Sequence, residues 1–82
     1  MATKAITQAE QEVVRFLADR PSLEEIIAFH PSPEANERFY ELQEIERGRE
    51  LAEDEEEELD SYLYLEHLMR LLKAEAHGRS GR

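Results

Sequence analysis

The chain has 82 residues, lacks cysteine, and carries twenty acidic against ten basic side chains, for a formal net charge of −10. The missing cysteine excludes disulfides, thiolate metal sites and a cysteine nucleophile, and the negative charge argues against direct contact with nucleic acid phosphates. A chain this short supports one domain that buries only about 60 to 65% of its unfolded surface, so self-association or partner binding would add stability.

Helix signals recur along the chain, and no segment alternates with the period of two expected for a half-buried strand. The first signal is a capping box formed by Thr7 and Glu10. It predicts a helix from about residue 8 to Asp19, which Pro21 closes off. The apolar side chains that share one face of this helix are Val13, Phe16 and Leu17.

A second, shorter helix is predicted directly after Pro21. Ser22 and Glu25 form another capping box. The helix ends at His30, because a residue that precedes proline is pushed out of the α region, and Pro31 follows. Its apolar side chains are Leu23, Ile26, Ile27 and Phe29.

The third predicted helix begins with Ser32 as its N-cap and Pro33 at its first helical position. We expect it to end near Arg47, because Gly48 stands where a left-handed residue commonly closes a helix. Its apolar stripe consists of Ala35, Phe39, Leu42 and Ile45.

The fourth predicted helix starts near Glu53, although Ala52 is a poor N-cap residue. The tail from Gly78 contains two glycines and a serine and is expected to be disordered. The prediction is therefore an all-α fold, a small bundle of about four helices with a long C-terminal helix. Residues 1–77 form its single domain and residues 78–82 its disordered tail.

This last helix opens with a run of acidic residues. Acids in a first turn complement the positive end of the helix dipole, and a solvated helix start is the simplest interpretation of such a run. Its functional alternative is electrostatic steering of a basic partner. The run lacks the alternating ligands and the turn glycine of a calcium-binding loop. The candidate steering residues are Glu53, Asp54, Glu55, Glu56, Glu57 and Glu58.

The same helix is apolar over more than one face. An inner stripe, which we define as Tyr62, Leu65, Met69, Leu72 and Ala76, lies beside an outer stripe, which we define as Tyr64, Leu68 and Leu71. A surface helix of a small protein normally shows one apolar stripe, so this helix is expected to be covered on two sides. The predicted partner interface comprises Tyr62, Tyr64, Leu65, Leu68, Met69, Leu71 and Leu72.

No pattern in the chain indicates catalysis or metal binding. The histidines, His30, His67 and His77, do not share the spacing of metal ligands on one helix face. The glycines are scattered, so there is no phosphate-binding loop. Ser22 and Ser32 are explained by capping. We expect no enzyme, cofactor or metal.

The N-terminal residues contain no apolar run of signal-peptide length, and no segment approaches the ~20 apolar residues of a transmembrane helix. We therefore expect a cytoplasmic protein with no membrane contact.

The segments that carry a resemblance are Pro21 to Phe29, Pro33 to Phe39, Glu55 to Leu59 and Leu65 to Ala74. Over about residues 13 to 76, the chain resembles a group of short bacterial proteins. Some of these are antitoxin-like, small acidic proteins encoded next to nuclease-type toxins. The resemblance implies a helical fold more directly than a function, and the net charge makes a basic protein the natural partner. The chain has no basic DNA-binding segment of the kind that many antitoxins carry.

The sequence supports one leading hypothesis and leaves others open. The leading hypothesis is a non-enzymatic protein-protein interaction module, antitoxin-like, that neutralises a basic toxin or nuclease. The alternative is a homodimeric structural or regulatory adaptor, since two-fold symmetry is the commonest oligomeric solution. The long helix could instead be the central helix of a monomeric bundle. An acidic mimic of nucleic acid is disfavoured because its acids lie too close together to imitate a row of phosphates.

Overall fold

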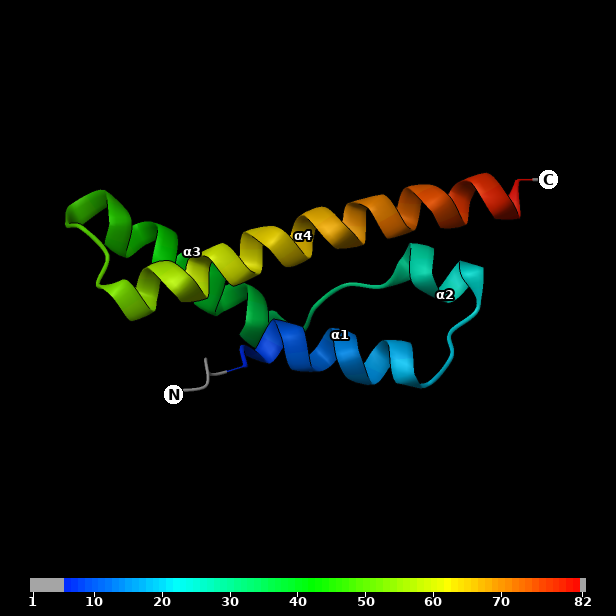
Figure 1. Ribbon diagram of the computed structural model, residues 1–82, viewed down its shortest axis with the longest axis horizontal. Helices are drawn as coiled ribbons and strands as arrows, with labels where there is room; N and C mark the ends of the chain where they lie inside the picture. Colours follow the sequence, from blue (N-terminus) through cyan, green and yellow to red (C-terminus); the bar gives the residue numbers. More distant parts are fainter. Residues whose placement is uncertain (1–5, 82) are drawn as a thin grey trace.

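The computed structural model describes residues 6–81, which form four helices and no β-strand. They are α1 (Gln8–Ala18), α2 (Leu23–Ala28), α3 (Pro33–Gly48) and α4 (Glu53–Ser80), arranged as in Figure 1. The structure confirms the predicted all-α bundle with a long C-terminal helix.

The first three helices begin where their capping residues predict. The Thr7 hydroxyl accepts a hydrogen bond from the Glu10 N–H at 3.1 Å, and the Glu10 carboxylate accepts one from the Thr7 N–H at 2.9 Å. Ser22 and Glu25 make the same reciprocal pair at the start of α2. At α3 the Ser32 hydroxyl accepts from the Ala35 N–H at 3.2 Å. Each pair satisfies N–H groups that a helix leaves without internal partners.

The start of α4 lacks a side-chain cap on Ala52, as the sequence predicts. The Glu55 carboxylate supplies the other half of a capping box, because it accepts a hydrogen bond from the Ala52 N–H at 2.8 Å. The acids in this first turn also face the positive end of the helix dipole. The acidic run therefore helps to begin the helix in which it lies.

The predicted role of Gly48 is wrong. No glycine among residues 6–81 has a positive φ, and Gly48 is the last residue of α3. The chain turns directly into an extended conformation at Arg49, whose N–H still donates to the Ile45 carbonyl at 3.0 Å. The left-handed residue of the described chain is instead Arg20, with φ of 54°, after α1.

The predicted disorder from Gly78 is not what the structure shows. Gly78 to Ser80 continue α4, and Gly81 is its C-cap, whose N–H donates to the His77 carbonyl at 3.1 Å. Residue 82 lies outside the described residues. Residues 77–81 are exposed, so local helix hydrogen bonds extend α4 past the predicted boundary.

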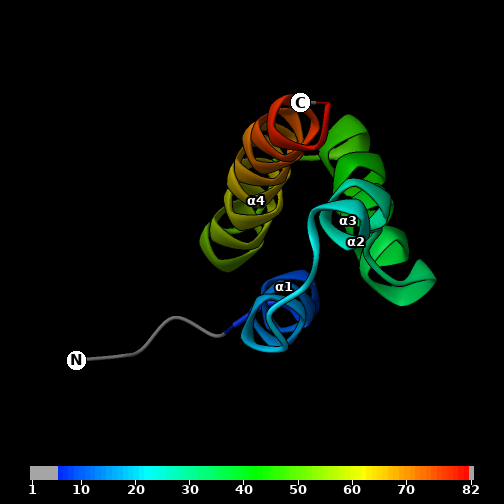
Figure 2. The ribbon, with the colours of Figure 1, turned by 90° about the vertical axis from the view of Figure 1, so that its right-hand side faces the viewer.

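The helices enclose a small core on one side of α4. The core cluster consists of Ala9, Ala35, Leu42, Leu59 and Tyr62, with Phe39, Leu51 and Leu65 packed against it. Figure 2, viewed nearly along α4, shows the other three helices together on one side of it. The helix is therefore not the central helix of a surrounded bundle, because its opposite side has no covering element within residues 6–81.

The short helix α2 packs under the C-terminal half of α4 (Figure 1). Lys73 of α4 donates through Nζ to the Phe29 carbonyl, just past the end of α2, at 2.6 Å. The Phe29 ring also lies against Phe16 of α1, with ring centroids 4.4 Å apart. These contacts fix a helix of six residues that would be unstable alone.

Candidate functional site

The outer stripe of α4 is exposed along its length. Tyr64, Leu68 and Leu71 are 65%, 41% and 56% exposed. Leu63, the other large exposed apolar side chain of α4, is 47% exposed. The other large exposed apolar side chains of the described chain lie outside α4: Ile6, Val14, Leu17 and Tyr40. The long helix therefore carries the main group of neighbouring apolar side chains that face solvent.

The rest of the predicted partner interface packs, wholly or partly, against other residues of the chain. Tyr62 is buried, and its ring centroid lies 5.8 Å from that of Phe39. Leu65, Met69 and Leu72 are half-buried on the inner side of α4. The structure thus divides the predicted set in two, and the outer stripe is its more exposed part.

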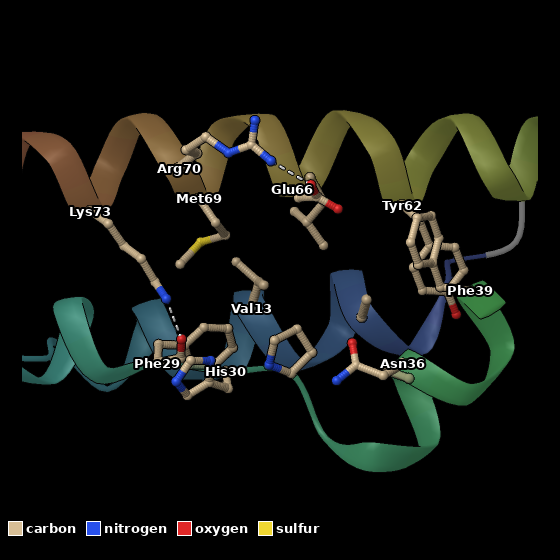
Figure 3. Close-up of a pocket in the computed structure, with 14 residues that line it drawn as sticks. Val13, Phe29, His30, Asn36, Phe39, Tyr62, Glu66, Met69, Arg70 and Lys73 are labelled. Carbon is tan, nitrogen blue, oxygen red and sulfur yellow. Dashed lines mark hydrogen bonds and ion pairs between the residues drawn. The ribbon is translucent and has the colours of Figure 1, made fainter.

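A pocket opens beside the inner stripe, between α4 and the elements that face it (Figure 3). It has a volume of about 280 Å³. Its lining is mainly apolar and includes Val13, Phe39 and Met69. At one end Lys73 crosses to the Phe29 carbonyl, as Figure 3 shows. The pocket is a continuation of the core that α2 and α3 leave partly open.

The pocket is small, and two of the charged side chains on its rim are paired with each other. Its volume falls just below the range of about 300 to 1,000 Å³ that is typical of small-molecule sites. Glu66 and Arg70 form an ion pair at 2.5 Å on its rim, four residues apart, as helix spacing predicts. His30 also lines the rim, but no described side chain pairs with it as a nucleophile would with a base. The pocket can accept an apolar group, and the outer stripe is the stronger candidate site.

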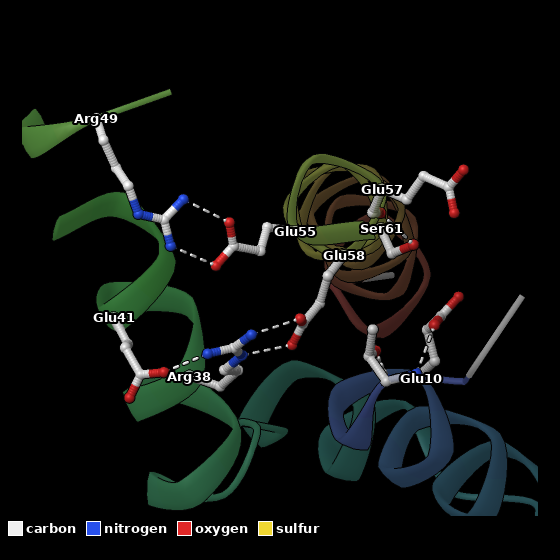
Figure 4. Close-up of polar contacts among 9 residues, drawn as sticks. Glu10, Arg38, Glu41, Arg49, Glu55, Glu57, Glu58 and Ser61 are labelled. Atoms are coloured by element: carbon white, nitrogen blue, oxygen red, sulfur yellow. Dashed lines mark hydrogen bonds and ion pairs between the residues drawn. The ribbon is translucent and has the colours of Figure 1, made fainter. Parts of the chain in front are cut away.

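Two acids of the run at the start of α4 are paired with arginines of the same chain (Figure 4). The guanidinium of Arg38 on α3 binds both carboxylate oxygens of Glu58, at 2.6 and 2.8 Å. It also pairs with Glu41 one turn along α3. These hydrogen bonds, chiefly those that Arg38 donates to Glu58, raise the pKa of Arg38. The two-pronged geometry fixes α3 against α4.

Glu55 is held in the same way by the chain segment that enters α4. Arg49 donates to both of its carboxylate oxygens at 2.9 Å. This hydrogen bonding, together with the one from the Ala52 N–H, lowers the pKa of Glu55 to about 2. Glu55 and Glu58 therefore stabilise the fold by binding arginines of the same chain. Sequence spacing alone did not identify these partners.

The remaining acids of the run keep their predicted exposure. Glu53, Asp54, Glu56 and Glu57 all face solvent. The carbonyl of Glu57 accepts a hydrogen bond from the Ser61 hydroxyl at 3.0 Å, which is a contact within α4. The surface that could steer a partner is thus narrower than the sequence indicates, and it precedes the outer stripe on the same helix.

Within residues 6–81, no group of three or more histidine, aspartate and glutamate side chains is placed to hold a metal ion. None of the helices described is both long enough and apolar enough to cross a membrane. The cytoplasmic location stays a prediction.

In comparisons with known proteins, no family model, no curated protein and no solved structure matches this chain. Its function must therefore be inferred from its own residues.

Proposed function

We propose that this chain is a non-enzymatic protein-protein interaction module whose contact surface is the outer stripe of α4. The observation that carries the proposal is the exposure of Tyr64, Leu68 and Leu71 on a helix whose other side is already packed. Adjacent exposed apolar side chains on a small protein commonly mark an interface. Tyrosine suits such a surface, because its ring can be buried while its hydroxyl reaches the wet rim.

The limited core supports the same proposal. Leu42 is the one large side chain of the described residues that is fully buried, and three of the buried apolar residues are alanines: Ala9, Ala35 and Ala76. Small domains have a narrow stability margin, which burial of a further apolar surface would widen. Covering the outer stripe would extend the core to the second side of α4.

Two kinds of partner fit the charge of this surface. A basic protein would be attracted by the exposed acids at the start of α4, in the role that the antitoxin-like resemblance implies. A second copy of the chain would also fit, because the C-terminal half of α4 carries exposed arginines. The second arrangement corresponds to a homodimeric adaptor.

Affinity capture from the native host tests the proposal. The wild-type chain should retain one protein in stoichiometric amount, either a different protein or the untagged chain. A variant carrying Leu68→Glu and Leu71→Glu should lose it. Tyr40→Glu is the control, because Tyr40 is more exposed than Leu68 and Leu71 but lies on α3. Recovery of the wild-type chain alone would refute the proposed function.

A further inference from the structure

The pocket beside the inner stripe is open because small side chains form much of its wall. Ala9 and Val13 of α1 and Ala35 of α3 all line it, and each leaves more space than a leucine would. Its volume of about 280 Å³ is nearly twice that of an apolar cavity of about 150 Å³ that binds benzene. Water in an apolar hollow has few hydrogen-bond partners, so an apolar group that displaces it gains affinity. The pocket therefore has room for a benzene-sized group with a short chain attached.

The charges on the lining of this pocket do not cancel. The charged side chains that line it are Glu66, Arg70 and Lys73. Glu66 and Arg70 are paired with each other at 2.5 Å. Lys73 has no carboxylate partner among residues 6–81, and its one hydrogen bond there is to the Phe29 carbonyl. The lining thus keeps an uncompensated positive charge in a chain whose net charge is −10.

Lys73 differs from the other basic side chains of the described residues. It is the one lysine within residues 6–81, and every ion pair in that range is made by an arginine. It is half-buried, and its ammonium reaches the Phe29 carbonyl at one end of the pocket (Figure 3). An ammonium has three N–H donors, so two remain after this bond. A carboxylate is the strongest acceptor for them, because both partners are then charged.

We propose that this pocket binds a small carboxylic acid with an apolar body. The body occupies the hollow beside Val13 and Met69, and the carboxylate accepts hydrogen bonds from the Lys73 ammonium. The bound acid thus covers apolar lining and neutralises the uncompensated charge together. No residue of the outer stripe lines the pocket, so this site is separate from the surface in the proposed function.

NMR titration of the full chain with 3-phenylpropionate tests the site. The methyl signals of Val13 and Met69 should shift and saturate, with a dissociation constant of about 1 mM or below. Those of Leu68 and Leu71 should not move, because they lie on the outer stripe. The absence of saturable shifts at Val13 and Met69 would overturn the proposal, as would equal shifts at Leu68 and Leu71.

A neutral probe, 3-phenylpropanol, separates the apolar contribution from that of Lys73, because it has the same ring and chain with a hydroxyl in place of the carboxylate. Lys73→Met should weaken binding of 3-phenylpropionate at least about tenfold, as expected when a charge-assisted hydrogen bond is lost, but binding of 3-phenylpropanol less than about twofold. Lys73→Arg should keep most of the affinity for 3-phenylpropionate, because it keeps the positive charge.

Arg79→Met is the control, because it removes a positive charge from α4 outside the pocket. It should leave both affinities unchanged. Equal weakening of both probes by Lys73→Met would mean that Lys73 acts only by holding α2, and an equal effect of Arg79→Met would mean that only net charge matters. Either result would overturn the proposal. Neither bears on protein capture through Leu68 and Leu71, so this inference and the proposed function can fail separately.

Discussion

Leu42 is the side chain on which the stability of the bundle is expected to depend most. It is 0% exposed and belongs to the cluster that joins α1, α3 and α4. Leu42→Ala removes buried carbon atoms and leaves a cavity, which costs about 2 to 5 kcal/mol. At roughly 0.05 to 0.15 kcal/mol per residue, the free energy of unfolding of the whole chain is only about 4 to 12 kcal/mol. A loss of about 3 kcal/mol would lower Tm by about 12 to 24 °C in a domain of this size.

Urea and thermal unfolding, followed by circular dichroism, measure this loss. Leu68→Ala is the matched control, because it removes the same atoms from a side chain that is 41% exposed. At concentrations too low for association, the control should cost less than about 1 kcal/mol, since exposed substitutions have small effects. Comparable losses in both variants would refute the assignment of Leu42 to the core and Leu68 to a contact surface.

Two further predictions follow from polar contacts. In Arg49→Gln, the pKa of Glu55 should rise from about 2 toward its ordinary value of 4.5, because its strongest hydrogen bond is lost. The stability that this lowered pKa contributes is complete above pH 4.5 and is lost as pH falls toward 2, so the variant should show a shallower acid dependence between these values. NMR titration measures the pKa, and an unchanged value would contradict the contact. Lys73→Met, which keeps the length of the side chain, should cost about 1 kcal/mol and speed amide exchange in α2, because the bond to Phe29 is lost. Unchanged exchange would show that Lys73 does not hold α2.

The sequence predicted best the features that depend on neighbouring residues. Thr7 with Glu10, and Ser22 with Glu25, stand three residues apart, and their hydrogen bonds form in the structure as the pattern indicates. In a helix cap, a nearby side chain replaces water as the hydrogen-bond partner of a free backbone N–H, so residues close in sequence determine whether it forms. The end of α3 lies one residue from the predicted position, but the left-handed conformation expected of Gly48 is wrong, because Arg49 leaves α3 through an extended conformation.

Contacts between residues that are distant in the sequence could not be predicted from residue spacing. Glu12 of α1 accepts hydrogen bonds from the backbone N–H and the hydroxyl of Ser32, at 2.8 and 2.5 Å. Partial burial raises the pKa of Glu12, but these hydrogen bonds, with the one from Gln8, outweigh it and lower the pKa overall. The periodicity of α1 gives no sign that Glu12 would meet the start of α3. Such pairs depend on how the helices pack, and helix packing is set by the whole core.

The difference between local and long-range contacts also explains why the apolar stripes were predicted well and the pairing of the acidic run was not. Periodicity correctly separated the outer stripe from the inner one, because both are properties of a single helix. The run of acids looked uniform in sequence, yet Arg38 and Arg49 bind Glu58 and Glu55 and leave the others in solvent. Solvent-exposed charges mainly set encounter rate and orientation, whereas buried apolar area supplies the driving force of association. The exposed acids are therefore expected to decide which way a partner lies on α4, and the outer stripe to decide whether it stays bound.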